Sequence, residues 1–195
     1  MAARSLVLAT RNPHKLKEFR RLIEPAGIVV ESLPDGIQLP PEDGSSFAEN
    51  ALPKARAAAA KATRASIADD SGIEAAALGG APGVRSARYA GERASDQENL
   101  DKLMDEVPAG SPLRYVCALV YVDPAEDQER LFFGYCDGRL AEHPRGSGGF
   151  GYDPAFIPEE GDGSRTMAEL SDEEKDAISH RGNAARALLA WLQGR

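Results

Sequence analysis

Apolar and polar positions alternate along the chain in blocks that predict strands and helices in turn. The short apolar run Ser5–Ala9 has polar neighbours on both sides and predicts a buried strand. Asn12 and Pro13 suit the N-cap and the first position of a helix, so a helix is predicted to begin at Pro13. Its apolar positions recur at helical spacing: Leu16, Phe19 and Ile23. Gly27 would end this helix, and residues 28–31 predict a second strand.

Later segments continue the alternation of helices and strands. A Ser followed three places later by Glu predicts a capped helix start at three places: Ser46/Glu49, Ser95/Glu98 and Ser171/Glu174. Pro53 would kink the first of these helices. Ile67-Ala68 predicts a short strand that ends at residues 69–72, and residues 114–123 and 130–137 predict a hairpin. A last helix has an apolar face of Ala184, Ala185, Leu188, Leu189 and Leu192. The alternation indicates the α/β class, with a mixed sheet because of the hairpin.

Composition and charge narrow the possible functions. The chain has 195 residues, 42% of them hydrophobic and 28% charged, which predicts one globular domain over residues 1–195. The net charge of −8 argues against a nucleic-acid polymer as partner, but a small nucleotide needs only a local group of cations. The longest apolar run, residues 115–122, is too short to span a membrane, and no signal peptide fits residues 1–11. A cytoplasmic protein is expected.

Two cysteines are too few for a disulfide framework or a zinc site. If the hairpin turn is centred between Glu126 and Asp127, Cys117 lies opposite Cys136, with Cβ atoms ~4.5–5.5 Å apart. In a reducing cytoplasm, we expect two buried thiols rather than a disulfide.

The first candidate for chemistry is the segment Thr10-x-Asn12-x-x-Lys15-x-x-Glu18. A helix N-terminus has backbone N–H groups that bind phosphate, and Lys15 in the first turn is unfavourable for the helix dipole unless an anion lies nearby. The alternative is a capped surface helix.

The second candidate is Asp69-Asp70-Ser71-Gly72. Adjacent carboxylates repel each other unless a cation is close, and neighbouring strand residues point to opposite faces, so one of them would bind a given metal. Oxygen ligands of this kind suit Mg²⁺, and Glu42 is a second candidate ligand. The alternative is an ordinary turn.

Two further segments could recognise a base. Residues 146–154 are rich in glycine yet hold Phe150 and Tyr152, whose rings could stack on a base, although a core position for Phe150 is the alternative. Lys175 and Ser179-His180-Arg181 offer hydrogen-bond donors, although taken alone they favour a capped helix start with solvated charges.

Together these segments resemble the inosine triphosphate pyrophosphatase family, which hydrolyses non-canonical purine nucleoside triphosphates. The matching pieces follow the family's order from residue 6 to about residue 192: Leu8–Asn12 with Lys15 and Glu18, Phe47–Ala51 with Lys54-Ala55, Ala68–Ile73, Leu78–Val84, Ser86–Tyr89, Gly148–Pro154, Ala168–Leu170, Lys175 and Ser179–Arg181. The chain departs from the family's pattern at Pro53 and at Pro40-Pro41.

The resemblance implies a two-lobed α/β fold around a substrate cleft, a homodimer, and Mg²⁺-dependent hydrolysis of ITP, dITP and XTP to the monophosphate and pyrophosphate. Asp70 would bind Mg²⁺ and orient or deprotonate the attacking water, with Glu42 as a second metal ligand. The remaining residues that it implies for substrate binding are Thr10, Arg11, Asn12, Pro13, His14, Lys15, Ser71, Phe150, Gly151, Tyr152, Asp153, Lys175, His180 and Arg181.

Discrimination between purines would rest on the 6-position, where inosine and xanthine have a carbonyl and adenine has an amine. A donor such as Arg181 or Lys175 would be unmatched against adenine. Two other interpretations remain. A pyrophosphatase of the Maf type shares the strand, loop and helix at the phosphate site but prefers other nucleotides, and residues 148–154 and 179–181 favour the first family over it. A non-catalytic nucleotide-binding module would lack Asp70 or Lys15, and both are present.

Overall fold

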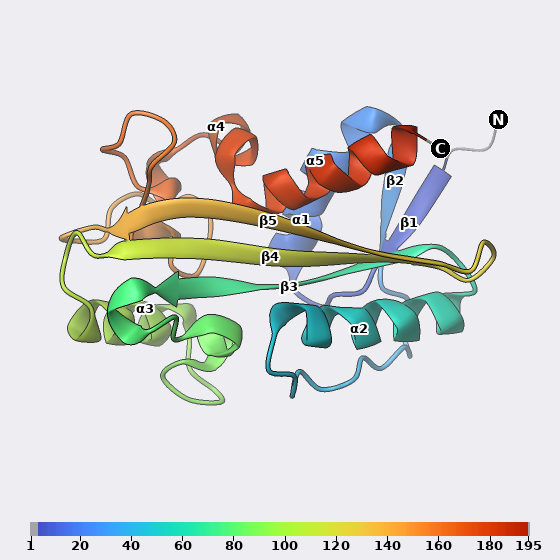
Figure 1. Ribbon diagram of the computed structural model, residues 1–195, viewed down its shortest axis with the longest axis horizontal. Helices are drawn as coiled ribbons and strands as arrows, with labels where there is room; N and C mark the ends of the chain where they lie inside the picture. The colour runs from blue at the N-terminus through green and yellow to red at the C-terminus, as the bar shows by residue number, and fades with distance from the viewer. Residues whose placement is uncertain (1–3, 195) are drawn as a thin grey trace. The chain divides into compact units, whose positions relative to one another are not determined.

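The computed structural model describes residues 4–194 and contains one mixed six-stranded sheet with flanking helices (Figure 1). The strands are β1 (Arg4–Leu8), β2 (Ile28–Ser32), β3 (Ser66–Ala75), β4 (Pro112–Asp123), β5 (Gln128–Leu140) and β6 (Phe156–Pro158). The α-helices are α1 (Pro13–Ile23), α2 (Phe47–Ala62), α3 (Asp96–Glu106), α4 (Asp172–Ile178) and α5 (His180–Gln193). The strand order is β2-β1-β3-β4-β5-β6; β1 is parallel to β2 and β3, and β5 is antiparallel to β6. The predicted α/β class with a mixed sheet is confirmed.

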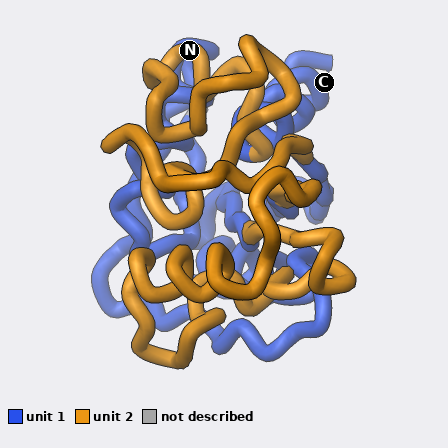
Figure 2. The backbone as a smooth tube through the Cα atoms, turned by 90° about the vertical axis from the view of Figure 1, so that its left-hand side faces the viewer, with its two compact units in different colours: residues 1–70, 117–134, 181–195 blue, residues 71–116, 135–180 orange. Residues whose placement is uncertain are grey.

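The chain divides into two compact units, drawn in different colours in Figure 2. Unit 1 comprises residues 1–70, 117–134 and 181–195, and unit 2 comprises residues 71–116 and 135–180. Two of the boundaries fall inside segments singled out for chemistry, between Asp70 and Ser71 and between His180 and Arg181. The prediction of one domain with a cleft between two lobes stays a prediction.

Unit 1 has helices on both faces of its strands, with α2 on one face and α1 and α5 on the other (Figure 1). The α1 and α5 side has a core of Leu, Ile and aromatic residues, among them Phe19, Tyr121 and Leu188. The α2 side is filled largely by alanine, including Ala51, Ala55, Ala58 and Ala59 of the helix. Small side chains let α2 lie close to the strands.

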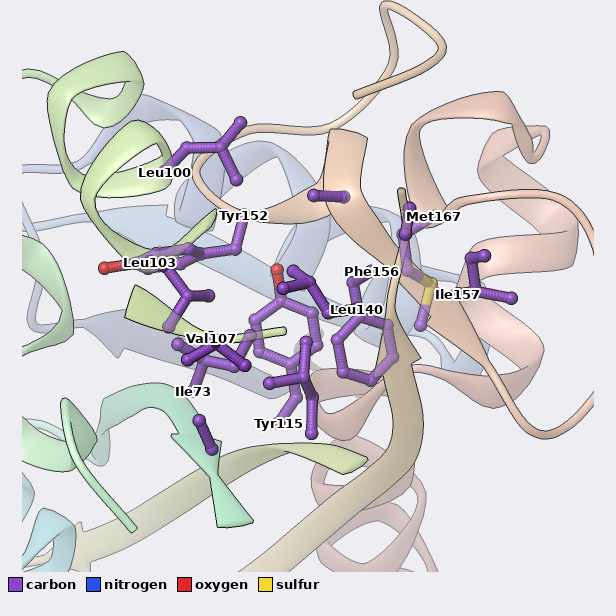
Figure 3. Close-up of a cluster of buried hydrophobic side chains, with 14 of the residues drawn as sticks. Ile73, Leu100, Leu103, Val107, Tyr115, Leu140, Tyr152, Phe156, Ile157 and Met167 are labelled. Carbon is purple, nitrogen blue, oxygen red and sulfur yellow. The ribbon is translucent and has the colours of Figure 1, made fainter. Parts of the chain in front are cut away.

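Unit 2 has its own apolar core (Figure 3). The labelled side chains of this cluster are Ile73, Leu100, Leu103, Val107, Tyr115, Leu140, Tyr152, Phe156, Ile157 and Met167. The apolar face of α3 supplies Leu100 and Leu103. Tyr115 and Tyr152 belong both to this core and to hydrogen bonds of the candidate site.

Most predicted helix starts are confirmed. The capping boxes at Ser95 and Ser171 are complete. At α2, Ser46 caps the helix, but the Glu49 carboxylate accepts from Ser45 instead, one residue earlier than a standard box. The helix then continues through Pro53 to Ala62.

Strand β3 differs from its prediction. It does not end at residues 69–72 but runs through them to Ala75. The interpretation of Asp69-Asp70-Ser71-Gly72 as a turn is therefore wrong. Both faces of the strand are covered, and buried ion pairs and hydrogen bonds replace the apolar contacts that usually identify such a strand.

The expected thiols are confirmed, since Cys117 and Cys136 are free and buried. Residues 124–127 form the turn between β4 and β5, so its centre lies one residue earlier than expected. The two cysteines belong to different cores, Cys117 to that of unit 1 and Cys136 to that of unit 2.

Within the described part of the chain, no helix combines the length and the apolar character needed to cross a bilayer. The signal-peptide prediction involves residues 1–3, which lie outside the described residues.

Candidate active site

The two adjacent aspartates of unit 1 lie just beyond the end of β1. Strand β1 ends at Leu8, which is opposite Ile67 of the parallel strand β3, and the Ala9 amide donates to the Ile67 carbonyl at 2.7 Å. Strand β3 continues to Asp69 and Asp70. These carboxylates are therefore next to the loop that connects β1 to α1, at the carboxyl edge where parallel α/β sheets bind ligands.

The loop after β1 is held by its own polar side chains. The Asn12 Oδ1 atom accepts from the backbone N–H groups of His14 (2.8 Å) and Lys15 (3.3 Å), and the Thr10 hydroxyl accepts from the Asn12 N–H (3.1 Å). Pro13 occupies the first helical position. The predicted start of α1 is confirmed, and it turns the Lys15 side chain toward β3.

Arg11 contacts the loop between β2 and α2. Its guanidinium donates to the carbonyls of Leu33 (2.9 Å), Pro34 (2.9 Å) and Ile37 (3.1 Å). An open pocket of about 530 Å³ lies here, lined by Arg11 and residues 36–39. Arg11 thus fixes the beginning of the loop that carries Glu42.

The Asp70 side chain faces α2. The Asn50 amide donates to Asp70 Oδ2 at 2.9 Å, and the Asn50 Oδ1 atom accepts from the Gly44 amide at 2.7 Å. A Cβ atom on Gly44 would lie 2.7 Å from that same Oδ1 atom, so the loop approaches α2 closely only because residue 44 is glycine. The buried Lys54 ammonium donates to the Glu42 carboxylate and, at 2.7 Å, to the backbone carbonyl of Asp69.

The Asp69 side chain points the opposite way, as the alternation of a strand requires. Its Oδ2 atom lies 2.9 Å from Lys15 Nζ and 3.5 Å from Arg181 Nε. Arg181 also donates from Nη1 to Glu18 Oε2 at 3.0 Å. Asp69 is fully buried, and the side chains of Arg181 and Glu18 are less than a tenth exposed.

Their surroundings shift the pKa values of the two aspartates in opposite directions. Burial raises the pKa of Asp70, and the nearby Glu42 carboxylate adds to this, against the opposing effects of Lys54 and Asn50. Burial would also raise the pKa of Asp69, but the charges of Lys15, Arg181 and Lys54 more than offset it and hold the pKa below the usual range. Asp69 therefore keeps its negative charge to lower pH than an ordinary aspartate, whereas Asp70 binds a proton more readily than one.

Unit 2 brings two of the predicted base-binding residues, Phe150 and Lys175, together around the carboxylate of a third, Asp153. Asp153 Oδ2 accepts from Lys175 Nζ at 2.7 Å and from the Phe150 backbone N–H at 2.9 Å. Lys175 Nζ also lies 5.5 Å from the centroid of the half-buried Phe150 ring. Asp153 and Lys175 are both buried. The ion pair thus fixes the glycine-rich loop to α4.

Tyr115 connects this ion pair to His180. Its hydroxyl donates to Asp153 Oδ1 at 3.1 Å, and its ring is stacked on His180 with centroids 4.6 Å apart and an interplanar angle of 13°. Both residues are buried. His180 is therefore placed by an aromatic contact from β4.

The other predicted residues hold the glycine-rich loop or lie beside the groups described above. The Tyr152 hydroxyl donates to the Ser86 carbonyl at 2.7 Å, and the Gly151 amide donates to Asp96 at 3.0 Å. Ser71 is half-buried and follows Asp70 in β3. The exposed Pro13 and His14 lie in the first turn of α1.

Five residues of these clusters were absent from the residues assigned to the site from the sequence: Glu18, Asn50, Lys54, Asp69 and Tyr115. The first four lie within the motifs that match the family, so those motifs could have indicated that they belong to the site. Nothing in the sequence marks Tyr115, which reads as a strand residue of the hairpin.

The arrangement in unit 1 is typical of an α/β enzyme that acts on phosphate groups. It combines a helix N-terminus, buried lysines and an arginine, and paired carboxylates at the carboxyl edge of parallel strands. The chain belongs to the Ham1 family, whose sequence profile matches residues 6–191. The resemblance inferred from the sequence motifs is thereby confirmed.

The relatives share both sequence and fold. A dITP/XTP pyrophosphatase of Geobacillus kaustophilus is 48% identical over 95% of this chain and 92% of its own length. The dITP/XTP pyrophosphatase of Escherichia coli K12 is 46% identical over 96% of this chain and 98% of its own length. A HAM1 protein from Coxiella burnetii superposes with a TM-score of 0.87 at 37% identity, covering 98% of this chain and all of that one.

Proposed function

We propose that the chain hydrolyses dITP, ITP and XTP to the nucleoside monophosphate and pyrophosphate, and so removes deaminated purines from the nucleotide pool. The observation that carries the proposal is the charge arrangement at the carboxyl edge of β1 and β3, in a chain that belongs to the Ham1 family. Relatives that match nearly the full chain are named dITP/XTP pyrophosphatases.

The polyphosphate would bind at the start of α1. Thr10 and Asn12 order the loop, the helix dipole favours an anion, and Lys15 adds a positive charge that is only partly exposed. Arg11, Pro13 and His14 belong to the same segment. Arg11 would contribute indirectly, because its guanidinium is bonded to the loop at residues 33–37.

A divalent metal fits the donors of unit 1, and we propose Mg²⁺. Asp70 and Glu42 offer carboxylate oxygens, and Mg²⁺ typically takes one or two protein carboxylates together with substrate phosphates and water. Repulsion from Glu42 contributes to the raised pKa of Asp70, and a cation held by these carboxylates would offset it. No group of three or more His, Cys, Asp or Glu residues suited to a metal occurs among the described residues. When bound, the metal would screen the phosphate charge and activate water.

The protein groups around Asp70 would orient the attacking water. Asn50 fixes Asp70 Oδ2, which leaves the carboxylate in one orientation and able to hold a water molecule in line with the α-phosphorus. The raised pKa of Asp70 makes it a better proton acceptor than an ordinary aspartate. Lys54 would hold Glu42 in place and stabilise negative charge that develops on the phosphate.

For recognition of the base we propose the aromatic and donor side chains that the family resemblance assigns to it. Phe150 offers a half-buried ring for stacking, and Lys175, His180 and Arg181 offer donors for the 6-oxo group of inosine or xanthine. Adenine has an amine at that position and would leave a buried donor unmatched. An Arg181→Ala variant that kept the full preference for ITP over ATP would contradict the part assigned to Arg181.

A homodimer is proposed from the exposed face of β5. Three alternate residues expose large apolar side chains there: Leu131 45%, Phe133 43% and Tyr135 46%. At either end of this row, Glu129 is paired with Arg56 and Asp137 with Arg114. An apolar row with charged ends suits a self-complementary contact with a second copy.

The cytoplasmic location stays a prediction, which cell fractionation would test.

The test is pyrophosphate release from ITP, dITP, XTP, GTP, ATP and dTTP, each with Mg²⁺ and with a chelator. Metal-dependent release largely confined to ITP, dITP and XTP is expected. A preference for dTTP would favour the Maf type, and no release by folded protein would leave a nucleotide-binding module. Mn²⁺ or Ca²⁺ in place of Mg²⁺ would test the identity of the metal.

A further inference from the structure

We propose that Asp69 is a positioning residue that sets Lys15 and Arg181 for the substrate, with its carboxylate as their shared counter-ion. This inference rests on the proposed function, because it deepens the role of two residues assigned there to the phosphates and the base. Asp69 itself would touch neither the substrate nor the metal.

The contact with Lys15 is direct and short. Lys15 Nζ lies 2.9 Å from Asp69 Oδ2, and Asp69 is the single carboxylate that forms an ion pair with Lys15 among residues 4–194. An ammonium has three N–H donors, so one bond to Asp69 leaves two for phosphate oxygens. The carboxylate thus fixes a long, flexible side chain while leaving it competent to bind.

Arg181 is held from two sides. Asp69 Oδ2 lies 3.5 Å from its Nε atom, and Glu18 Oε2 accepts from Nη1 at 3.0 Å. Glu18 lies on α1 and Arg181 on α5, so these two carboxylates fix the guanidinium between the helices and β3. Glu18 has no ion pair with Lys15, which makes it a natural control.

The backbone of Asp69 holds a third cation. Its carbonyl oxygen accepts from Lys54 Nζ at 2.7 Å, while the same ammonium donates to Glu42. Asp69 lies in the middle of β3 with its side chain fully buried, so its position is rigid. One residue therefore contacts Lys15, Lys54 and Arg181. Substitution of its side chain removes the contacts with Lys15 and Arg181 but leaves the backbone contact with Lys54.

The burial of Asp69 explains why this role would matter for binding. A carboxylate held inside the fold keeps Lys15 and Arg181 in place before substrate arrives, and less side-chain freedom is lost on binding. The effect should therefore fall mainly on KM and on the choice of base, and little on kcat.

The experiment compares Asp69→Asn, Asp69→Glu, Lys15→Met, the double variant Asp69→Asn/Lys15→Met, and Glu18→Gln. Steady-state kinetics with ITP and ATP would be measured on proteins whose circular dichroism matches the wild type. Asp69→Asn should raise KM for ITP about tenfold, with kcat changed less than about threefold, and should lower the ITP/ATP preference. Glu18→Gln should lower that preference with a much smaller change in KM.

The double variant separates positioning from general structural damage. If Asp69 acts through Lys15, the KM of the double variant should lie within about threefold of that of Lys15→Met alone. Asp69→Glu keeps the charge and should restore part of the loss, and it replaces Asp69→Asn in the comparison if the latter does not fold.

Two results would overturn the inference in an active enzyme: an unchanged KM in Asp69→Asn, with or without a loss of kcat, or effects of the two single substitutions that multiply in full. Failure of the proposed function looks different, because the wild-type protein itself would then release no pyrophosphate from ITP or XTP.

Discussion

Gly149, in the 146–154 loop, is a glycine at which a side chain would collide with a buried ion pair. Its φ is +69°, and a Cβ atom there would lie 2.0 Å from Asp153 Oδ2 and 3.0 Å from Lys175 Nζ. Asp153 is a short, buried side chain with three hydrogen-bond donors around it, so it cannot move without losing partners. Gly149→Ala should therefore break the Asp153–Lys175 pair.

The magnitude follows from two contributions. A non-glycine residue in the left-handed region costs roughly 1–2 kcal/mol. Separating a buried ion pair costs roughly 3–5 kcal/mol, because it leaves a charge without compensation. Gly149→Ala should thus lower the free energy of unfolding by about 4–7 kcal/mol. At Gly151, φ is +63° and nothing lies within 4 Å of an added Cβ atom. Gly151→Ala should therefore lower the free energy of unfolding only by the backbone cost of roughly 1–2 kcal/mol.

The assay is thermal unfolding of Gly149→Ala and Gly151→Ala, followed by calorimetry and circular dichroism. In a protein of this size, 1 kcal/mol shifts the midpoint by about 2–4 °C, so the two variants should differ by roughly 10 °C. ITP turnover should fall with the loss of the ordered loop in Gly149→Ala. Equal midpoints for the two variants would refute the packing argument, since backbone conformation alone would then explain both.

Asp70→Asn should reduce ITP turnover at least about 100-fold while the unfolding midpoint does not fall, because the raised pKa means that the charged form is unfavourable in the fold. Asp69 has a lowered pKa, so its contribution to stability is present above the ordinary aspartate pKa of about 4 and is lost as the pH falls below it. Unfolding midpoints of wild type and Asp69→Asn should converge on acidification. Phe133→Lys should give a monomer in sedimentation, whereas Val29→Lys, at an equally exposed site on β2, should not. Because burial raises the pKa of Cys136 to about 12 and that of Cys117 further, neither native thiol should react with maleimide at neutral pH, as intact mass would show.

Helix starts could be predicted well because their signals are local. Asn12 with Pro13, and Ser95 or Ser171 with a glutamate three residues later, satisfy N–H groups within one turn, so no distant contact is needed. At α2, Ser46 still accepts from the Glu49 N–H, but the Glu49 carboxylate accepts from the backbone N–H of Ser45 instead of that of Ser46. The residues of the candidate site could be found by motif, but their contacts could not.

The contacts depend on segments that are far apart in the chain. Glu18 and Arg181, 163 positions apart, form a buried ion pair that no local pattern indicates. Tyr115 reads as an ordinary strand residue, yet it donates to Asp153 and stacks on His180. Strand β6 is short and was not predicted, because three residues hold no periodicity.

The strand through Asp69 and Asp70 explains how one dipeptide serves two purposes. Two carboxylates in a turn would share one environment, but in a strand they face opposite sides of the sheet. One side presents Lys15 and Arg181, and the other presents Asn50 and Glu42. The first environment keeps Asp69 charged and fixed, and the second gives Asp70 a raised affinity for a proton or a cation. The two aspartates cannot exchange roles, because each role comes from the face and not from the side chain.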